Sequence, residues 1–291
     1  MKHAWIDDQR PFFRLRLMCK VLKVSRSGYY KHLRCSISLR AQREAAFVKV
    51  MQTLVQLHSY RYGSPRIAIL LRRQGIPCST NRVARLMANY GLGARRKKRY
   101  RITTQRDRTA LASPNQLAQC FHVRIINNTW LTDITYIDTA EGWLFLTVVL
   151  DLASRRVVGW ALLPTLEQHG PVQALRQALG RRRPSPGLIV HSDRGSQFTS
   201  HAFRALLHEH RISQSMSGTG NCYDNAPMES FFGTLKRELI HHRKYQTRDE
   251  ARLSIIDYIE LYYNAKRIHS SIGYQTPIEW ERQQATTTKQ G

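Results

Sequence analysis

The stretch TWLTDITYIDTAEGWLFLTVVLDLASRRVVGWAL, residues 129–162, decides the fold of the larger part of this chain. Trp130–Ile137, Trp143–Leu150 and Arg155–Leu162 are each rich in β-branched, aromatic and aliphatic side chains, and turn-like residues separate them. Three such runs in succession predict three strands that pair as an antiparallel meander.

Beyond the meander, the pattern alternates between helix and strand. We expect a helix over 167–179, a short buried strand over 188–191, a helix over 200–210, a strand over 212–216 and a helix over 228–239. The order βββαβαβα predicts an α/β domain built on a mixed sheet.

Three acidic residues occupy informative positions in this pattern. Asp133 lies within the first strand between apolar residues, where an unpaired charge is costly. Asp193 follows the fourth strand in LIVHSDRGSQFTS, and Glu229 begins the last helix, with 35 residues between the two. Hard carboxylate oxygens suit Mg²⁺ or Mn²⁺. Two such ions would activate the attacking hydroxyl and stabilise the leaving oxygen in a phosphoryl transfer.

Other carboxylates could compete for this role. Asp138 and Asp151 are expected in turns, where aspartate bonds the local backbone. Asp224 lies five residues before Glu229 in a Gly/Asn-rich loop. We interpret all three as structural, and Asp224 is the strongest substitute ligand among them.

The last helix also carries a cation beside its carboxylate. Lys236 follows Glu229 by seven residues, nearly two turns, so both lie on one face, while Phe231, Leu235 and Leu239 form a separate apolar stripe. Taken alone, the pair could be ordinary surface residues. Together with the two aspartates, it suggests a metal ligand next to a phosphate-binding lysine.

The first hundred residues read as helical. RLRLMCKVL and RSGYYKHL flank a turn at Val24–Ser25, which fits either a helix-turn-helix or a plain helical hairpin. A helix over 41–57 should bury Phe47, Met51, Leu54 and Leu57. A further helix over Arg66–Gln74 should bury Ile67, Leu70 and Leu71.

A second helix-turn-helix is expected next. After the turn IPCST, Ser79 or Thr80 should cap a helix over Asn81–Asn89 that directs Asn81, Arg82 and Arg85 outward, as in a major-groove reader. A basic run follows at once, and its charges would neutralise phosphates. We predict DNA contacts from Asn81, Arg82, Arg85, Arg95, Arg96, Lys97, Lys98, Arg99 and Lys236.

Composition supports a nucleic-acid partner. The 291 residues include 46 Lys and Arg against 20 Asp and Glu, a net charge of +26. No apolar stretch approaches the roughly 18 residues that span a bilayer, and the N-terminus MKHAWIDDQRPFF lacks a signal-peptide core. Five scattered cysteines form no Cys-x-x-Cys pair, so we expect no disulfide framework or structural zinc site, and a cytoplasmic location.

At these residues the chain resembles the catalytic subunit of transposases of the insertion sequence three family, relatives of retroviral integrases. The resemblance covers nearly the whole chain. The matching stretches are MCKVLKVSRSGYY, HSYRYGSPRI, TWLTDITYI, VHSDRGSQFTS, NCYDNAPMESFFGTLKRE and YYNAKRIHSSIGYQTPIEW.

The resemblance implies an RNase H-like, retroviral integrase-type catalytic core preceded by all-α helix-turn-helix regions. It implies that Asp133, Asp193 and Glu229 form a catalytic DDE triad that holds two Mg²⁺ or Mn²⁺ ions. It also implies double-stranded DNA partners, namely terminal repeats and target DNA, and a homo-oligomeric synaptic complex at the bacterial nucleoid. Finally, it implies that the chain is the product of the element's second reading frame. Such a product works with a first-frame protein, either as a separate partner or fused to it.

We therefore predict a DNA transposase that cleaves the ends of an insertion sequence and transfers the strands. The predicted domains are a small helical region (1–40), a helix-turn-helix region with a basic tail (41–105), a linker (106–125), the catalytic domain (126–285) and a tail (286–291). Two alternatives stay open: a DNA-binding regulator with an idle catalytic fold, and an RNase H-like nuclease that only hydrolyses.

Overall fold

The computed structural model describes residues 2–34, 38–94, 113–117, 121, 123–218 and 222–287. The chain divides into two compact units, Met1–Gly93 and Ala94–Gly291. The predicted basic run Arg95–Arg99 and most of the predicted linker 106–125 lie outside the described residues. The predicted domain boundaries stay a prediction.

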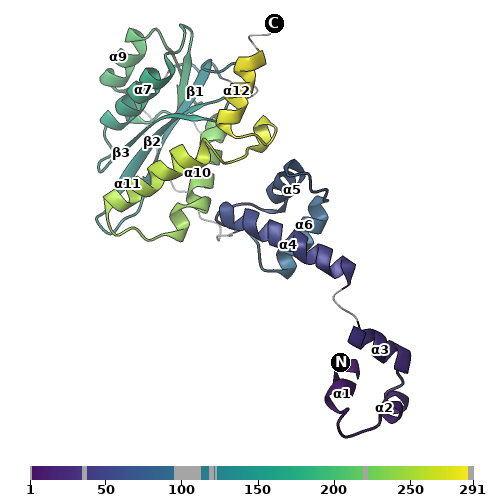
Figure 1. Ribbon diagram of the computed structural model, residues 1–291. Helices are drawn as coiled ribbons and strands as arrows, with labels where there is room; N and C mark the ends of the chain where they lie inside the picture. Colours follow the sequence, from purple (N-terminus) through teal and green to yellow (C-terminus); the bar gives the residue numbers. More distant parts are fainter. Residues whose placement is uncertain are drawn as a thin grey trace. The chain divides into compact units, whose positions relative to one another are not determined.

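Helices are the only regular secondary structure among the described residues of the first unit (Figure 1). Its helices are α1 (Lys2–Asp8), α2 (Leu15–Val21), α3 (Arg26–Arg34), α4 (Leu39–Leu57), α5 (Ser64–Arg73) and α6 (Thr80–Asn89). Helices α1–α3 enclose a small core of Ile6, Met18, Cys19 and Tyr29. Ser25 caps α3, because its Oγ accepts from the Gly28 N–H at 3.0 Å.

Helices α5 and α6 form the second predicted helical pair. Gly75, with φ of +77°, ends the first of them, and the side chain of Ser79 caps the second by accepting from the Arg82 N–H at 3.2 Å. Two burial predictions were wrong. Leu57 is 66% exposed because it lies at the last residue of α4, where Val55 is buried instead, and Leu70 is only half-buried.

The second unit contains one five-stranded sheet with strand order β3-β2-β1-β4-β5. Strands β1 (Thr129–Ile137), β2 (Leu144–Asp151) and β3 (Val157–Leu163) form the predicted antiparallel meander. Strands β4 (Ile189–Ser192) and β5 (Ser213–Met216) continue it in parallel with β1. The sheet is therefore mixed, and the predicted fold class is confirmed.

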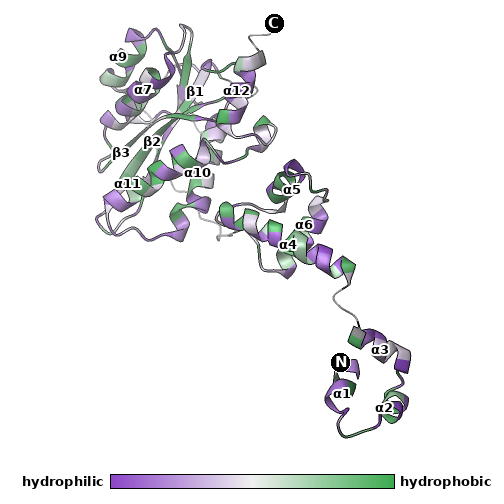
Figure 2. Cartoon of the chain, viewed as in Figure 1, coloured by the Kyte–Doolittle hydropathy of each residue, from purple (hydrophilic) through white to green (hydrophobic). Residues whose placement is uncertain are grey.

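Helices cover both faces of this sheet (Figure 1). Helix α7 (His169–Arg182) and α9 (His201–Glu209) pack with β1–β5 around a core that includes Trp130, Val190 and Phe203. Gly159 on β3 permits this packing, since a Cβ there would lie 2.2 Å from the carbonyl oxygen of Ala174. Strands β1, β2 and β3 are largely hydrophobic, whereas the helices alternate between hydrophobic and hydrophilic residues (Figure 2).

Several elements were not predicted. The sequence patterns gave no expectation for α1, for the short α8 (Ser196–Thr199), or for the segments that follow α10 (Ala226–Glu238). Those segments are α11 (Arg248–Asp257), a π-helical turn η3 (Tyr258–Tyr263) and α12 (Pro277–Thr287), with 3₁₀ turns η2 (Ile240–His242) and η4 (Ser270–Ile272). A further 3₁₀ turn, η1 (Cys222–Asn225), directly precedes α10.

The C-terminal segments complete the edge of the sheet. The buried side chain of Asn264 accepts from the N–H of Val157 and donates to its carbonyl, both at 3.0 Å, so it imitates a neighbouring strand along β3. Glu281 on α12 binds Arg156 at 2.6 Å and Arg182 at 2.7 Å. Residues far apart in the sequence thus tie the C-terminal segments to the sheet.

Candidate active site

Strand register brings Asp133 and Asp193 to the same place in the fold. Strands β1 and β4 run parallel, with Leu131 opposite His191. Two residues further along the chain are Asp133, which shares the face of Leu131 because side chains in a strand alternate with a period of two, and Asp193, which directly follows the end of β4. Adjacent strands lie about 4.8 Å apart, so the two carboxylates are neighbours at the point where β4 ends and β1 continues alone.

The carboxyl group of Asp133 has an unusual electrostatic environment. Burial, together with the negative charges of Asp193 and Glu229, raises its pKa to about 8, although a backbone hydrogen bond and Lys236 oppose the shift. That hydrogen bond comes from the Ile134 N–H at 2.7 Å. The charges of Asp193, Glu229 and Lys236 therefore each act on the carboxyl group of Asp133. We call Asp133, Asp193 and Glu229 the carboxylate site.

Local hydrogen bonds fix Asp193 at the end of its strand. The Gly195 N–H donates to the Oδ1 of Asp193 at 3.0 Å, and the Ser192 hydroxyl donates to its carbonyl oxygen at 2.9 Å. A Cβ at Gly195 would lie 3.1 Å from that same Oδ1. The turn therefore holds the carboxylate in one orientation and leaves little room for a larger residue at 195.

Helix α10 carries the third carboxylate and the lysine. Glu229 lies exposed in its first turn, while the predicted stripe of Phe231, Leu235 and Leu239 is buried. Lys236 is half-buried, and burial lowers its pKa while Asp133 acts in the opposite direction. Its Nζ also lies 5.0 Å from the centre of the Tyr136 ring. The structure thus brings Lys236 to the carboxylate site.

The side chains of the carboxylate site are oxygen ligands of the kind that Mg²⁺ and Mn²⁺ prefer. Among the described residues, no three His, Cys, Asp or Glu side chains lie close enough to form a closed cage around one metal ion. Mg²⁺ does not require such a cage, since it is held by one or two carboxylates together with waters and substrate phosphates. A divalent cation held by Asp133 would offset the burial and the repulsion by Asp193 that raise the pKa of its carboxyl group.

The alternative carboxylates have structural partners. Asp151 is fully buried and accepts hydrogen bonds from the Asn127 N–H at 2.7 Å and from the N–H and hydroxyl of Ser154 at 2.9 and 3.0 Å. Asp224 accepts from the Gly218 N–H at 2.7 Å and from the side-chain amide of Asn115 at 2.9 Å. Asp138 is exposed just after β1. These contacts support the structural interpretation of Asp151 and Asp224.

A buried histidine near the site was not predicted. His191 has no exposed surface, and its Nδ1 and Nε2 lie 2.9 and 3.2 Å from the hydroxyls of Ser215 and Ser217. Burial lowers its pKa to about 4, so the imidazole is neutral at pH 7. The ring thus ties β4 to β5 directly before Asp193. A polar residue inside the apolar run LIVHSD was the sequence signal for it.

The predicted DNA-contacting residues of α6 do not share one environment. Asn81 and Arg85 are exposed and lie four residues apart on one face of the helix. Arg82 is half-buried, and its guanidinium carbon lies 4.4 Å from the centre of the Phe47 ring. Asn81 and Arg85 are thus presented to solvent, whereas Arg82 is partly engaged in packing α6 against α4.

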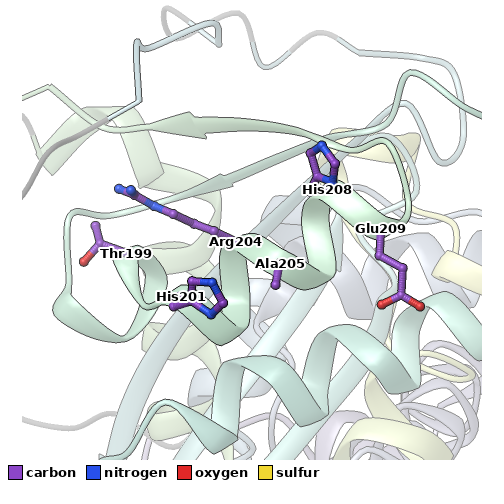
Figure 3. A pocket seen from close by; sticks show the side chains of 6 residues that line it. All are labelled: Thr199, His201, Arg204, Ala205, His208 and Glu209. Carbon is purple, nitrogen blue, oxygen red and sulfur yellow. The ribbon is translucent and has the colours of Figure 1, made fainter.

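A shallow hollow lies elsewhere on the second unit, over α8 and α9 (Figure 3). Exposed His201 and His208 and half-buried Arg204 project around it, with Thr199, Ala205 and Glu209. None of the three residues of the carboxylate site lines this hollow.

The chain matches known protein families along most of its length. Two family models described as "Integrase core domain" match residues 124–222 and 229–284, and a model described as "HTH-like domain" matches residues 42–100. The carboxylate site lies within the integrase-core matches, and α6 lies within the HTH-like match. The protein is therefore of the class that joins a helix-turn-helix-like domain to an integrase core.

Relatives define the family more closely. The transposase InsF for insertion sequence IS3A of Escherichia coli (strain K12) is 39% identical over 97% of this chain and 98% of the relative. The transposase for insertion sequence element IS904 of Lactococcus lactis subsp. lactis (strain IL1403) is 43% identical over 77% of this chain and 89% of the relative. The chain belongs to this family of insertion-sequence transposases, as its motifs predicted.

Solved structures of viral integrases are also similar. A simian T-cell lymphotropic virus intasome in complex with a PP2A regulatory subunit matches with a TM-score of 0.46 and 13% identity, over 78% of this chain and 73% of that one. The catalytic core domain of BIV integrase matches with a TM-score of 0.43 and 21% identity, over 56% and 99%. In the part of the chain that the structure describes, no helix is both long and apolar enough to span a membrane.

Proposed function

We propose that this transposase cleaves the ends of its insertion sequence and joins them to target DNA through Asp133, Asp193 and Glu229, which hold divalent metal ions. The observation that carries the proposal is the carboxylate site itself, where burial and mutual repulsion raise the pKa of Asp133 to about 8. Such a cluster is unfavourable in a fold without a cation to neutralise it.

The chemistry of the carboxylate site follows from its residues. We expect two Mg²⁺ or Mn²⁺ ions to bind here. They would activate the attacking hydroxyl and neutralise the charge on the leaving oxygen. Asp133 and Asp193 would hold the cations from the sheet, and Glu229 would do so from α10. Lys236 binds a phosphate of the terminal DNA as a point charge, which requires no fixed bidentate geometry.

The first unit binds double-stranded DNA in this proposal. Asn81 and Arg85 read base edges in the terminal repeats, and Arg82 supports them from its contact with Phe47. The basic run Arg95–Arg99 supplies affinity that does not depend on sequence. Two DNA ends and a target require more than one catalytic site, so we also propose a homo-oligomeric synaptic complex at the bacterial nucleoid, with a first-frame protein as partner or fusion.

The test is a strand-transfer assay with duplexes that carry the terminal repeats of the element, a target plasmid and Mg²⁺. We expect Asp133→Ala, Asp193→Ala and Glu229→Ala each to abolish cleavage and joining while DNA affinity stays within about twofold, because these residues would bind cations rather than phosphates. Asp138→Ala is the matched control, since it removes an exposed carboxylate five residues from Asp133.

The products distinguish the alternatives. Joined ends support a transposase, cleaved but unjoined ends indicate hydrolysis alone, and binding without either product indicates a regulator with an idle catalytic fold. Wild-type activity in any one of the three alanine variants would remove that residue from the site.

A further inference from the structure

Two large aromatic rings stand half-exposed at the end of the β1–β2 hairpin. Tyr136 is 50% exposed and Trp143 is 49% exposed. Their ring centres lie 5.0 Å apart with an angle of 82° between the planes, so the edge of one ring meets the face of the other. Part of each ring remains open to solvent. We call these two residues the aromatic pair.

The hairpin holds the aromatic pair in a fixed position. The Gly142 N–H donates to the carbonyl of Thr139 at 3.0 Å, and the Thr139 hydroxyl donates to the carbonyl of Gly142 at 2.6 Å. Arg248 on α11 braces the turn from outside, since its Nε donates to the carbonyl of Trp143 at 3.1 Å. The rings are therefore presented on a rigid turn, which lowers the entropy lost when a ligand stacks on them.

The aromatic pair adjoins the carboxylate site through Lys236. The Nζ of Lys236 lies 5.0 Å from the centre of the Tyr136 ring, and Lys236 also interacts electrostatically with Asp133. Tyr136 follows Asp133 by three residues on β1, so the two side chains leave the strand on opposite faces, and it is Lys236 that approaches both. A group bound on the exposed rings would thus lie next to the cation that we assign to a DNA phosphate.

We propose that the aromatic pair binds an unpaired nucleobase at the terminus of the DNA end held in the active site. The inference rests on the proposed function, because it takes DNA as the ligand of Lys236. Exposed aromatic faces beside a phosphate-binding cation are the combination that binds single-stranded nucleic acid, and every base has a face that can stack. An apolar protein partner would have to cover the charged ammonium of Lys236 beside the rings, whereas the phosphate of a nucleotide would bind it.

This arrangement positions the scissile phosphate. A terminal base that leaves the duplex and stacks on Trp143 or Tyr136 would hold the strand end beside Lys236 and Asp133. Tyr136 and Trp143 act here as positioning residues, and they take no part in the bond-breaking step. Stacking on an aromatic side chain changes affinity by roughly tenfold, so its loss is measurable.

Equilibrium binding without divalent cations tests the proposal on the full-length protein. Two terminal-repeat duplexes are compared, one fully paired and one with its last two base pairs mismatched. We expect wild type to prefer the mismatched end about tenfold, Trp143→Leu to lose most of this preference, and Trp143→Phe to keep most of it because the ring is retained. Trp5→Leu is the matched control, since Trp5 is 48% exposed in the first unit.

A second measurement locates the base. 5-Iodouracil placed at the last positions of the mismatched end should, on irradiation, crosslink to Tyr136 or Trp143. Equal affinity of wild type for both duplexes, an unchanged preference in Trp143→Leu, or crosslinks confined to other residues would each overturn the proposal. The binding assay needs no metal, so an inactive carboxylate site would leave its result unchanged. Conversely, if the aromatic pair does not bind a base, alanine substitution of Asp133, Asp193 or Glu229 should still abolish cleavage and joining.

Discussion

At the scale of single residues, Lys236 links the features of the site. It lies on the face of α10 that also carries Glu229, its charge acts on Asp133, and its Nζ lies over the ring of Tyr136. An ammonium group is not a metal ligand, so Lys236 can affect the reaction only by binding the DNA or by adjusting its neighbours. Substitutions at this position therefore separate phosphate positioning from metal binding.

We expect Lys236→Ala to slow end cleavage and joining about a hundredfold, because small misplacements of a reacting group have effects of that size. Metal affinity should stay near that of wild type. Lys236→Arg should recover part of the rate, since charge and reach are roughly kept. Single-turnover cleavage and metal titration on the same variants measure both effects.

The neighbouring Arg237 provides the control for this prediction. It is exposed on the same helix, and its guanidinium bonds the hydroxyl of Thr234 at 3.2 Å. Arg237→Ala should cleave at nearly the wild-type rate. If Lys236→Ala did so as well, Lys236 would be an ordinary surface lysine and the argument from the shared helix face would be wrong.

At the scale of elements, the position of α10 depends on contacts from the C-terminal segments. Glu238, the last residue of α10, binds Arg267 at 2.8 Å with both side chains more than nine-tenths buried. The Tyr258 hydroxyl from η3 donates to the same carboxylate at 2.8 Å. These contacts fix the end of the helix that begins near Glu229.

Arg267→Met should lower the free energy of unfolding by about 3–5 kcal/mol, because it leaves the carboxylate of Glu238 buried without its cation. Urea unfolding measures the loss. Arg181→Met is the matched control, since Arg181 pairs with Glu260 at 2.7 Å while its side chain is 40% exposed, and its loss should be at most about 1 kcal/mol.

A double variant tests the reason for this loss. Combining Arg267→Met with Glu238→Leu removes both charges, so much of the lost stability should return. Equal or greater destabilisation in the double variant would mean that packing, rather than an unpaired buried charge, explains the effect of Arg267→Met.

The ion cluster on α12 gives the fold an acid-sensitive contact. Burial raises the pKa of Glu281, but hydrogen bonds and charges from Arg182 and Arg156 outweigh it, so the pKa lies below its ordinary value. A carboxyl whose pKa is lower in the folded state stabilises the fold above its unfolded pKa. That stability is lost as the pH falls through the folded value.

Glu281→Gln should therefore be less stable than wild type by about 3 kcal/mol at pH 7, and this difference should shrink below about pH 4.5. Urea unfolding at several pH values from 7 to 3 measures both curves. Glu167→Gln removes an exposed carboxylate and should follow wild type at every pH. A difference that stays constant down to pH 3 would show that ionisation of Glu281 does not contribute.

The sequence predicted those elements whose pattern is local. The meander, the two parallel strands and α10 were visible because apolar residues recur with the period of a strand or a helix. The contacts of Asn264, Arg267 and Glu281 were not, because each depends on a residue 29 or more positions away. Similarly, Asp133 and Asp193 could be chosen as ligands, but only the register of β1 with β4 brings them side by side.

At the scale of the whole molecule, the positive charge is unevenly distributed. Residues 1–93 contain 18 of the 46 Lys and Arg but only three of the 20 Asp and Glu, so this unit has a net charge of +15. Residues 94–101 add six basic residues and no acidic one. The integrase core that follows carries most of the acidic residues. DNA should therefore bind chiefly to the first hundred residues, while the integrase core contacts it mainly at the site of cleavage.

We therefore expect DNA affinity to fall about a thousandfold or more between 50 and 200 mM salt, as it does for proteins that neutralise six to ten phosphates. Exchanging Arg95, Arg96, Lys97, Lys98 and Arg99 for Gln should weaken binding to all sequences equally and flatten the salt dependence, because phosphate contacts carry no sequence information. Exchanging Asn81 and Arg85 for Ala should instead reduce the preference for terminal repeats and leave the salt slope nearly unchanged. Titrations of terminal-repeat and unrelated duplexes over a range of salt concentrations separate the two effects. A salt slope near zero would mean that the excess positive charge does not contact DNA. If the variant of Asn81 and Arg85 kept its sequence preference, α6 would be excluded as the element that reads the DNA.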